Sequence, residues 1–210
     1  LTDRDVFSLG LFHTETRWFT AKPLSATAAN VERAVRFLET HTDSGGTELG
    51  VALEQALGLP RVAGGCSRHL LVVTDAEVTD AGRLLRLADD ESRQESARRV
   101  SVLCIDAAPN SFLAQQLAER GGGVARFLTS NPQEDDVTSA LDEILRDWSA
   151  PVHTGLGLEI DSAGVEAAGR RVVPGEQPDR SVVDLGDLPA GRPVWVAGRV
   201  PRPLGERLVF

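Results

Sequence analysis

Apolar positions recur in two rhythms along the first 150 residues of the chain. Continuous apolar runs, such as residues 70–73 and 102–105, alternate with stretches in which apolar residues recur every three or four positions. The first pattern is typical of strands buried on both faces of a parallel sheet, and the second of amphipathic helices. Their alternation predicts an α/β fold, with a doubly wound, mostly parallel sheet and helices on both faces.

The same pattern gives the expected order of elements. A hairpin comes first, then helices and strands alternate, and Gly121, Gly122 and Gly123 end the fourth helix. The expected strands are residues 6–12, 16–20, 68–75, 100–106 and 124–128. Four of the expected helices are residues 28–40, 47–57, 112–120 and 136–148. A fifth, between the second and third of these, is expected to be N-capped by Thr79.

The last sixty residues have a different character, because seven of the eleven prolines fall there. Prolines at this density interrupt helices and favour short strands and turns. We therefore expect an α/β domain at 1–150 and a small antiparallel β unit at 151–210. The strands expected in the β unit are residues 157–160, 171–173, 181–185, 193–198 and 207–210.

Composition excludes several classes of function. The net charge is −9, which makes the chain a poor counter-ion for nucleic acid or for an anionic membrane. No apolar run approaches the roughly 20 residues of a membrane span, and no signal-peptide pattern is present. The chain begins at Leu1 and contains no Met. We therefore expect it to be a fragment or a processed product.

The two cysteines exclude a disulfide scaffold. Parallel pairing of their strands is expected to place Cys104 near Val73, roughly 20 Å from Cys66 at about 3.3 Å per residue. Because a disulfide needs Cα atoms within about 7 Å, we expect free thiols. Free thiols lean weakly towards a cytoplasmic compartment.

Polar residues gather where the predicted strands end. In open α/β sheets ligands bind beyond the carboxyl ends of the strands. Asp75 and Glu77 follow one strand, Asp106 follows the next, and a loop with Ser44 and Thr47 enters a helix at the same edge. A hydroxyl and a carboxylate on a glycine-bearing loop suit a hard cation such as Mg²⁺.

The segments Ser44-Gly45-Gly46-Thr47-Glu48-Leu49 and Leu71-Val72-Val73-Thr74-Asp75-Ala76-Glu77 resemble the second and third motif segments of a von Willebrand factor type A domain. Residues 185–199 are similar to the stretch that follows this domain where it is joined to a vault/inter-α-trypsin-type domain. The resemblance spans roughly residues 4–200. It implies a Rossmann-like fold and a metal-ion-dependent adhesion site to which Thr47 and Asp75 contribute, with Ser44, Glu77 and Asp106 as further contributors at the rim.

Two departures from the family pattern are visible. Ala76 stands where the family usually has Gly, and the family's first motif, D-x-S-x-S, is absent. By resemblance, that motif lies on the central strand and supplies three of the closest metal ligands. We therefore expect a gap in the sheet between the strands at 6–12 and 68–75. The missing strand would come from an N-terminal segment or a companion chain.

The resemblance implies a non-catalytic, adhesion-type module that recognises an exposed carboxylate on a protein partner through Mg²⁺ or Mn²⁺. With only two expected ligands, the chain itself should bind the cation weakly or not at all. One alternative is a scaffold with a vestigial metal site, and another is a metal-assisted hydrolase using Asp75, Glu77 and Asp106. Thr47 as a helix N-cap and the acidic residues as solvated loop residues are the structural alternatives. The family also occurs outside cells, so the compartment stays open.

Overall fold

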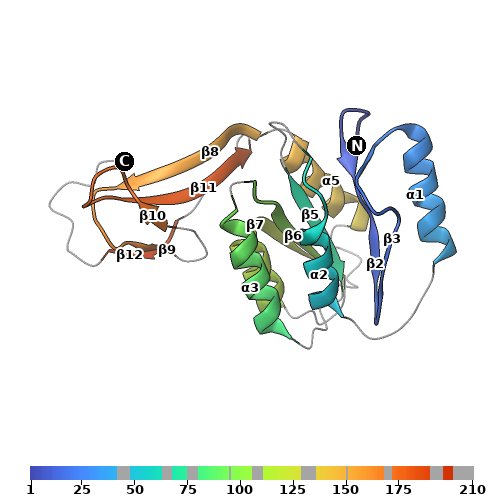
Figure 1. The fold of residues 1–210 in the computed structure, drawn as a ribbon, viewed down its shortest axis with the longest axis horizontal. Coiled ribbons are helices and arrows are strands. Elements are labelled where there is room, and N and C mark those ends of the chain that lie inside the picture. Colours follow the sequence, from blue (N-terminus) through green and yellow to red (C-terminus); the bar gives the residue numbers. More distant parts are fainter. Residues whose placement is uncertain are drawn as a thin grey trace.

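The computed structural model describes ten stretches of the chain and divides them into an α/β part and an elongated β-rich part (Figure 1). The described residues are 1–41, 48–62, 68–74, 80–94, 96–105, 111–128, 136–149, 151–167, 172–189 and 196–200. Among them, no helix is both long enough and apolar enough to cross a membrane.

The α/β part is built on three parallel strands in the order β5-β6-β7. These are β5 (His69–Thr74), β6 (Arg99–Ile105) and β7 (Gly122–Leu128). The inner strand β6 is buried at five consecutive positions from Val100 to Cys104, which agrees with its unbroken apolar sequence.

Helices pack on both faces of this sheet. The helices α2 (Leu49–Gly58), α3 (Ala81–Ser92) and α4 (Ser111–Arg120) form one core with alternate residues of β5 and β6. The helix α5 (Val137–Ser149) covers the opposite face, where Ile144 and Ala140 pack with Leu103. The α/β fold expected from the sequence is therefore confirmed, with three described helices on one face and one on the other.

The first 41 residues form antiparallel ribbons and a helix. The strand β2 (Gly10–Phe12) pairs with β3 (Thr16–Trp18), and β1 (Val6–Phe7) pairs with β4 (Leu24–Ser25). The helix α1 (Ala28–Thr40) has the bounds expected from its periodicity. The Thr27 hydroxyl caps it by accepting the Asn30 N–H.

The hairpin is tied to the larger domain through α2. The Glu48 N–H donates to the carbonyl of His13 at 2.8 Å, and the Trp18 indole N–H donates to the Gln55 side chain at 2.9 Å. Phe12 also packs against the larger core. Within the described residues, however, β2-β3 and β5-β6-β7 are separate sheets.

The β-rich part follows α5 directly. The long strands β8 (Pro151–Ile160) and β11 (Ser181–Pro189) pair antiparallel, and β10 (Val172–Pro174) adds to the far edge of β11. The short strands β9 (Glu166–Ala167) and β12 (Gly198–Arg199) form a second small pair. Val183 is fully buried and Val165 nearly so, which gives this part a small core of its own.

The structure corrects several expected boundaries. The α3 N-cap is Asp80, not Thr79, because the Asp80 carboxylate accepts the Arg83 N–H. The helix α2 starts at Leu49 with Glu48 in the N-cap position, two residues later than the expected start at residue 47. The strand β8 starts at Pro151 rather than at residue 157. Val196 and Ala197 lie outside any strand, although a strand was expected over residues 193–198.

The glycine run after α4 does more than stop a helix. Gly122 has a φ of 69°, in the left-handed region that favours glycine. A Cβ on Gly123 would stand 2.2 Å from the carbonyl oxygen of Val100. The run therefore turns the chain sharply and lets β7 approach β6 closely.

Candidate functional site

The carboxyl ends of the parallel strands form one edge of the α/β domain. The strand β5 ends at the buried Thr74, and β6 ends at Ile105. The helices α3, α4 and α5 start at the same edge, because each follows one of these parallel strands and returns along it. This arrangement is the usual ligand-binding edge of open α/β sheets.

The site residues expected from the sequence lie outside the described residues. They are Ser44, Thr47, Asp75, Glu77 and Asp106. Three of them adjoin described residues in the sequence. Asp75 directly follows Thr74, Asp106 directly follows Ile105, and Thr47 directly precedes Glu48, whose N–H binds His13 at the end of β2.

Two described carboxylates at this edge act as helix caps. Asp80 accepts the Arg83 N–H at 3.0 Å, and Asp136 accepts the Ser139 N–H at 2.7 Å. The backbone hydrogen bond from Ser139 is the main cause that holds the pKa of Asp136 below its ordinary value. Both side chains are engaged with their own helices, which separates them from the residues expected to bind a ligand.

The sequence segments that follow the described strand ends or precede the described helices share a charge pattern that motif reasoning did not use. Residues 42–48, 75–80, 106–111 and 129–136 contain nine Asp or Glu residues and neither Lys nor Arg. A surface lined by one sign of charge raises the local concentration of counter-ions. The spacing of charges relative to the ends of the predicted strands could have revealed this pattern from the sequence.

The donor chemistry of the expected site fits a hard divalent cation. Thr47 and Ser44 offer hydroxyl oxygens, and Asp75, Glu77 and Asp106 offer carboxylates. Mg²⁺ prefers oxygen ligands of this kind. No group of three or more His, Cys, Asp or Glu side chains placed to hold a metal ion occurs among the residues that the structure describes.

A histidine and a cysteine lie on neighbouring strands of the sheet. His69 stacks on Trp148 with 4.6 Å between ring centroids. Cys104 is buried opposite Thr74 rather than opposite Val73, one residue further along β5 than expected. Cys66 lies outside the described residues, so the state of the two thiols stays a prediction.

Helices on both faces of a parallel sheet, with oxygen donors at its carboxyl edge, define a Rossmann-like binding domain. Comparison with known proteins then identifies the family. The model of the von Willebrand factor type A domain matches residues 1–127, more than half of the sequence, and the chain belongs to this family. Its members generally mediate protein–protein interaction and are generally not catalytic.

Individual relatives extend the similarity beyond the matched family model. The human inter-alpha-trypsin inhibitor heavy chain H4 is 26% identical over 175 residues, which is 79% of this chain and 18% of that protein. A solved von Willebrand factor type A structure from Catenulispora acidiphila superposes with a TM-score of 0.73 at 18% identity. It covers 90% of this chain and 47% of that one.

A third similar protein has a smaller match. An aerotolerance-related membrane protein from Bacteroides fragilis superposes with a TM-score of 0.56 at 19% identity, over 70% of this chain and 81% of that one. The two structural matches are distant in sequence and concern the fold alone. This chain spans less than a fifth of the human relative and about half of the Catenulispora protein.

Proposed function

We propose that this chain is a protein-binding module that recognises an acidic group on a partner protein through a divalent cation at the carboxyl edge of its sheet. Thr47 and Asp75 hold the cation in this proposal, and Ser44, Glu77 and Asp106 contribute around it. A carboxylate oxygen of the partner completes the coordination. The cation would be Mg²⁺ or Mn²⁺, because the donors are all oxygens.

One observation carries the proposal. The described strands β5 and β6 end side by side just before Asp75 and Asp106, and every formal charge in the sequence segments that bear the expected donors is negative. Such an edge repels a carboxylate unless a cation lies between them. A bound cation would therefore attract an acidic partner to a surface that otherwise repels it.

The chain by itself offers few ligands for the cation. Thr47 and Asp75 contribute two oxygens, whereas Mg²⁺ needs near-octahedral coordination. We therefore expect an affinity weaker than micromolar in the isolated chain. A further segment or companion chain would have to supply the remaining donors.

Mn²⁺ titration followed by NMR tests the proposal. Paramagnetic broadening should reach the amides of Thr74 and Ile105 first, because they adjoin the expected site. The substitution Asp75→Ala should remove this broadening, whereas Asp142→Ala on the exposed side of α5 should leave it unchanged. Micromolar Mg²⁺ affinity of the chain alone, or broadening centred elsewhere, would contradict the proposal.

A second candidate is a scaffold in which the metal site is vestigial and the β-rich part mediates assembly. The open edge of β8 favours it. This ten-residue strand pairs only with β11 among the described residues, and unpaired edges readily accept another strand. Partner binding that survives both EDTA and Asp75→Ala would favour the scaffold over the metal-dependent module.

A further inference from the structure

The three-stranded sheet of the β-rich part has two different edges. The Gly175 N–H donates to the carbonyl of Arg180 at 2.9 Å, so these two residues bond across the ladder between β10 and β11. Residues alternate along an antiparallel ladder, and Pro174 therefore turns its backbone to the outer edge of β10. Proline has no N–H to donate. The outer edge of the three-residue strand β10 is thus short and lacks a donor at Pro174.

The other edge of the sheet, along β8, contains no proline after its first residue. Because Arg180 bonds towards β10, alternation makes Val183 bond towards β8, where it lies opposite Leu158. Leu158 therefore bonds back to β11, and the N–H and C=O groups of Gly157 and Glu159 point outwards. Among the described residues β8 pairs only with β11, and β8 forms the upper margin of the β-rich part in Figure 1.

The last residues of β8 have two different faces. Leu156, Leu158 and Ile160 are half-buried on one face, and Gly157 and Glu159 are exposed on the other. Side chains that lie opposite each other on paired strands share a face of the sheet and contact each other. A strand that pairs with this edge therefore has to be apolar on the first face and to leave room for a carboxylate on the second.

The end of β8 meets these requirements itself when it runs antiparallel to a second β8 with Leu158 at the centre. Leu158 then lies opposite Leu158 of the second copy, and Leu156 lies opposite Ile160. Gly157 lies opposite Glu159, and their outward backbone groups bond to each other. Each Glu159 carboxylate then lies beside a residue that has no side chain.

The two neighbouring registers fit less well. Centring the pair on Glu159 would place the two Glu159 carboxylates directly opposite each other, and like charges in this position destabilise a sheet. Centring it on Gly157 would leave Ile160 without an apolar residue opposite it. The register centred on Leu158 is therefore the one that we expect.

The distribution of charge favours contact between the β-rich parts. Residues 1–150 carry 15 basic and 23 acidic side chains, a net charge of −8, whereas residues 151–210 carry 7 and 8, a net charge of −1. Strong like charge opposes self-association. The segment that contains β8 is therefore the part of the chain in which like charge opposes contact least.

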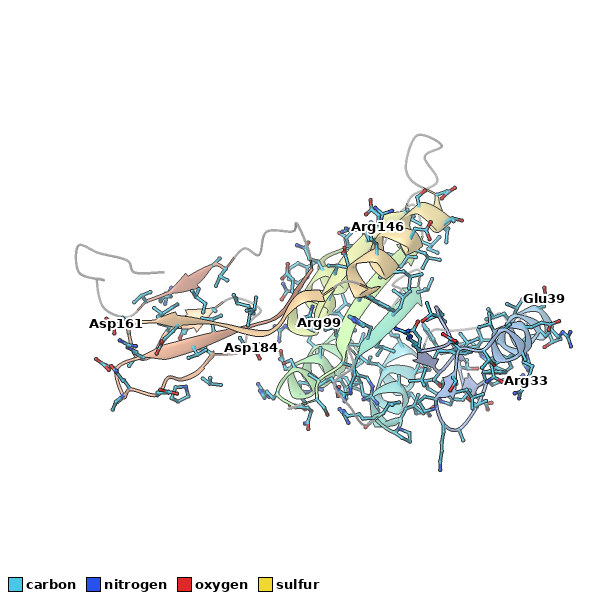
Figure 2. The ribbon with its side chains drawn as sticks, turned by 90° about the horizontal axis from the view of Figure 1, so that it is seen from above. Arg33, Glu39, Arg99, Arg146, Asp161 and Asp184 are labelled. Atoms are coloured by element: carbon cyan, nitrogen blue, oxygen red, sulfur yellow. The ribbon has the colours of Figure 1, made fainter. Side chains whose placement is uncertain are left out.

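Antiparallel pairing also keeps the two α/β parts apart. The strand β8 starts directly after α5, and Figure 2 shows Asp161 at the tip of β8 that lies away from the α/β part, in which Arg99 is labelled. The two β8 strands run in opposite directions, so the two Pro151 residues lie roughly 45 Å apart at about 3.3 Å per residue. This distance is several times the Debye length of about 8 Å at physiological salt.

The arrangement is complete with two copies. The combined sheet has the order β10-β11-β8-β8-β11-β10, so both of its outer edges are β10. Short edges that carry proline do not readily accept another strand. A two-fold pairing through β8 therefore gives a closed dimer and not a filament.

We propose that two copies of this chain associate as a dimer through antiparallel pairing of β8, centred on Leu158. The inference deepens the scaffold candidate, since it names the partner of the β8 edge, and it does not depend on the cation site. The ladder over residues 156–160 is short, so we expect a buried area below about 1,200 Å² and a dissociation constant on the order of 100 μM.

Cysteine cross-linking tests both the pairing and its register. Opposite residues that do not bond to each other have Cα atoms about 4.5 Å apart, which a disulfide can span. The chain carries Cys66→Ser, so its remaining cysteine is the buried Cys104. Leu158→Cys should then form a disulfide dimer at least about tenfold faster than Leu156→Cys or Ile160→Cys alone. A mixture of the latter two should cross-link again, because these positions lie opposite each other.

The matched control lies on the other edge of the sheet. Val172→Cys on β10 should not cross-link, because Pro174 removes a donor from that edge. Near-ultraviolet circular dichroism of each reduced variant checks that it is folded.

Amide exchange of the unmodified chain, followed by NMR, tests the dimer without any substitution. Raising the concentration from about 20 μM to about 1 mM should slow exchange at Gly157 and Glu159 by about fourfold, as expected for this dissociation constant. Exchange at Leu158 should change little, because its N–H already bonds to β11.

Two outcomes would overturn the proposal. One is equal cross-linking of the three single-cysteine variants, or none. The other is exchange at Gly157 and Glu159 that does not depend on concentration, and protection at every concentration would show that the same chain already fills this edge. Every measurement is repeated in EDTA and with Asp75→Ala. The dimer should persist there, whereas binding of an acidic partner through a cation should be lost, so failure of one proposal is distinguishable from failure of the other.

Discussion

At the scale of single residues, the most enclosed charge among the described residues is Glu91 at the end of α3. Its side chain is 4% exposed and bonds the guanidinium of Arg61 at 2.6 Å and the backbone N–H of Arg98 at 2.8 Å. Arg98 is 11% exposed and also donates to the carbonyls of Leu57 and Leu59. Burial is the main cause that lowers the pKa of the Arg98 guanidinium, and Glu91 opposes that effect.

The substitution Glu91→Gln should therefore destabilise the domain strongly. It removes the carboxylate that balances two guanidinium groups, and breaking a buried pair typically costs about 3–5 kcal/mol. Arg61 is partly exposed, so we expect a loss of about 2–4 kcal/mol in the free energy of unfolding, measured by urea denaturation. Glu54→Gln breaks the exposed pair with Arg83 and should cost at most about 1 kcal/mol. Equal losses in the two variants would contradict this account.

Single residues also show how far sequence motifs could predict strand ends and helix caps. The sequence predicted the end of β5 at Thr74 and Asp75 to within a residue, because a strand end can be recognised from an apolar run that stops at polar residues, whereas the placement of Thr47 and Asp75 at a site stays a prediction. It assigned the α3 cap to Thr79, since Thr79 and Asp80 are both good caps and adjacent. Only the hydrogen bond from Arg83 distinguishes them.

At the scale of elements, the long periodic segments were predicted best. The helix α1 has the bounds that its apolar spacing predicted, and β5 and β6 differ from prediction by a residue or so at each end. The short strands β4, β9 and β12 were missed, because two residues carry no periodicity. The start of β8 was missed because a sequence that begins with Pro151 and includes His153 does not favour a strand. Pairing with β11 nevertheless holds these residues in the strand.

The helix α5 depends on its first-turn cap, and this dependence should vary with pH. The Asp136 carboxylate accepts the Ser139 N–H, and this bond holds the pKa of Asp136 below its ordinary value of 3.8. A lowered pKa means that the ionised cap stabilises the folded state above the unfolded pKa. This contribution disappears as the pH falls through the folded pKa.

The substitution Asp136→Ala should therefore lower the melting temperature at neutral pH, because α5 loses its cap. The difference from the unmodified chain should stay constant down to about pH 5 and shrink as the pH falls below the ordinary Asp value. Circular dichroism melts at a series of pH values measure it. Asp142→Ala, also on α5, should show no such pH dependence, and a difference that persists at pH 2 would rule out the cap as its cause.

At the scale of the whole molecule, the two parts have separate cores. Every buried residue of the larger core and of the α5 core lies before residue 149, and Val165 and Val183 are buried within the β-rich part. The connection between the parts runs from α5 directly into β8 (Figure 1). The change in proline density near residue 150 predicts a domain boundary there, whereas the length of β8 and β11 depends on their mutual pairing and could not be predicted locally.

A chain that ends at Ser149 should therefore fold without the β-rich part. Because the described residues of both of its cores lie before residue 149, we expect its melting temperature to change by less than about 4 °C, which corresponds to about 1 kcal/mol in a domain of this size. Residues 151–210 alone should be unfolded, because sixty residues with so few buried apolar side chains do not offset the entropy of ordering them. Calorimetry and near-ultraviolet circular dichroism of the two pieces measure this. Loss of cooperative unfolding in the 1–149 piece would show instead that the β-rich part is required for the fold.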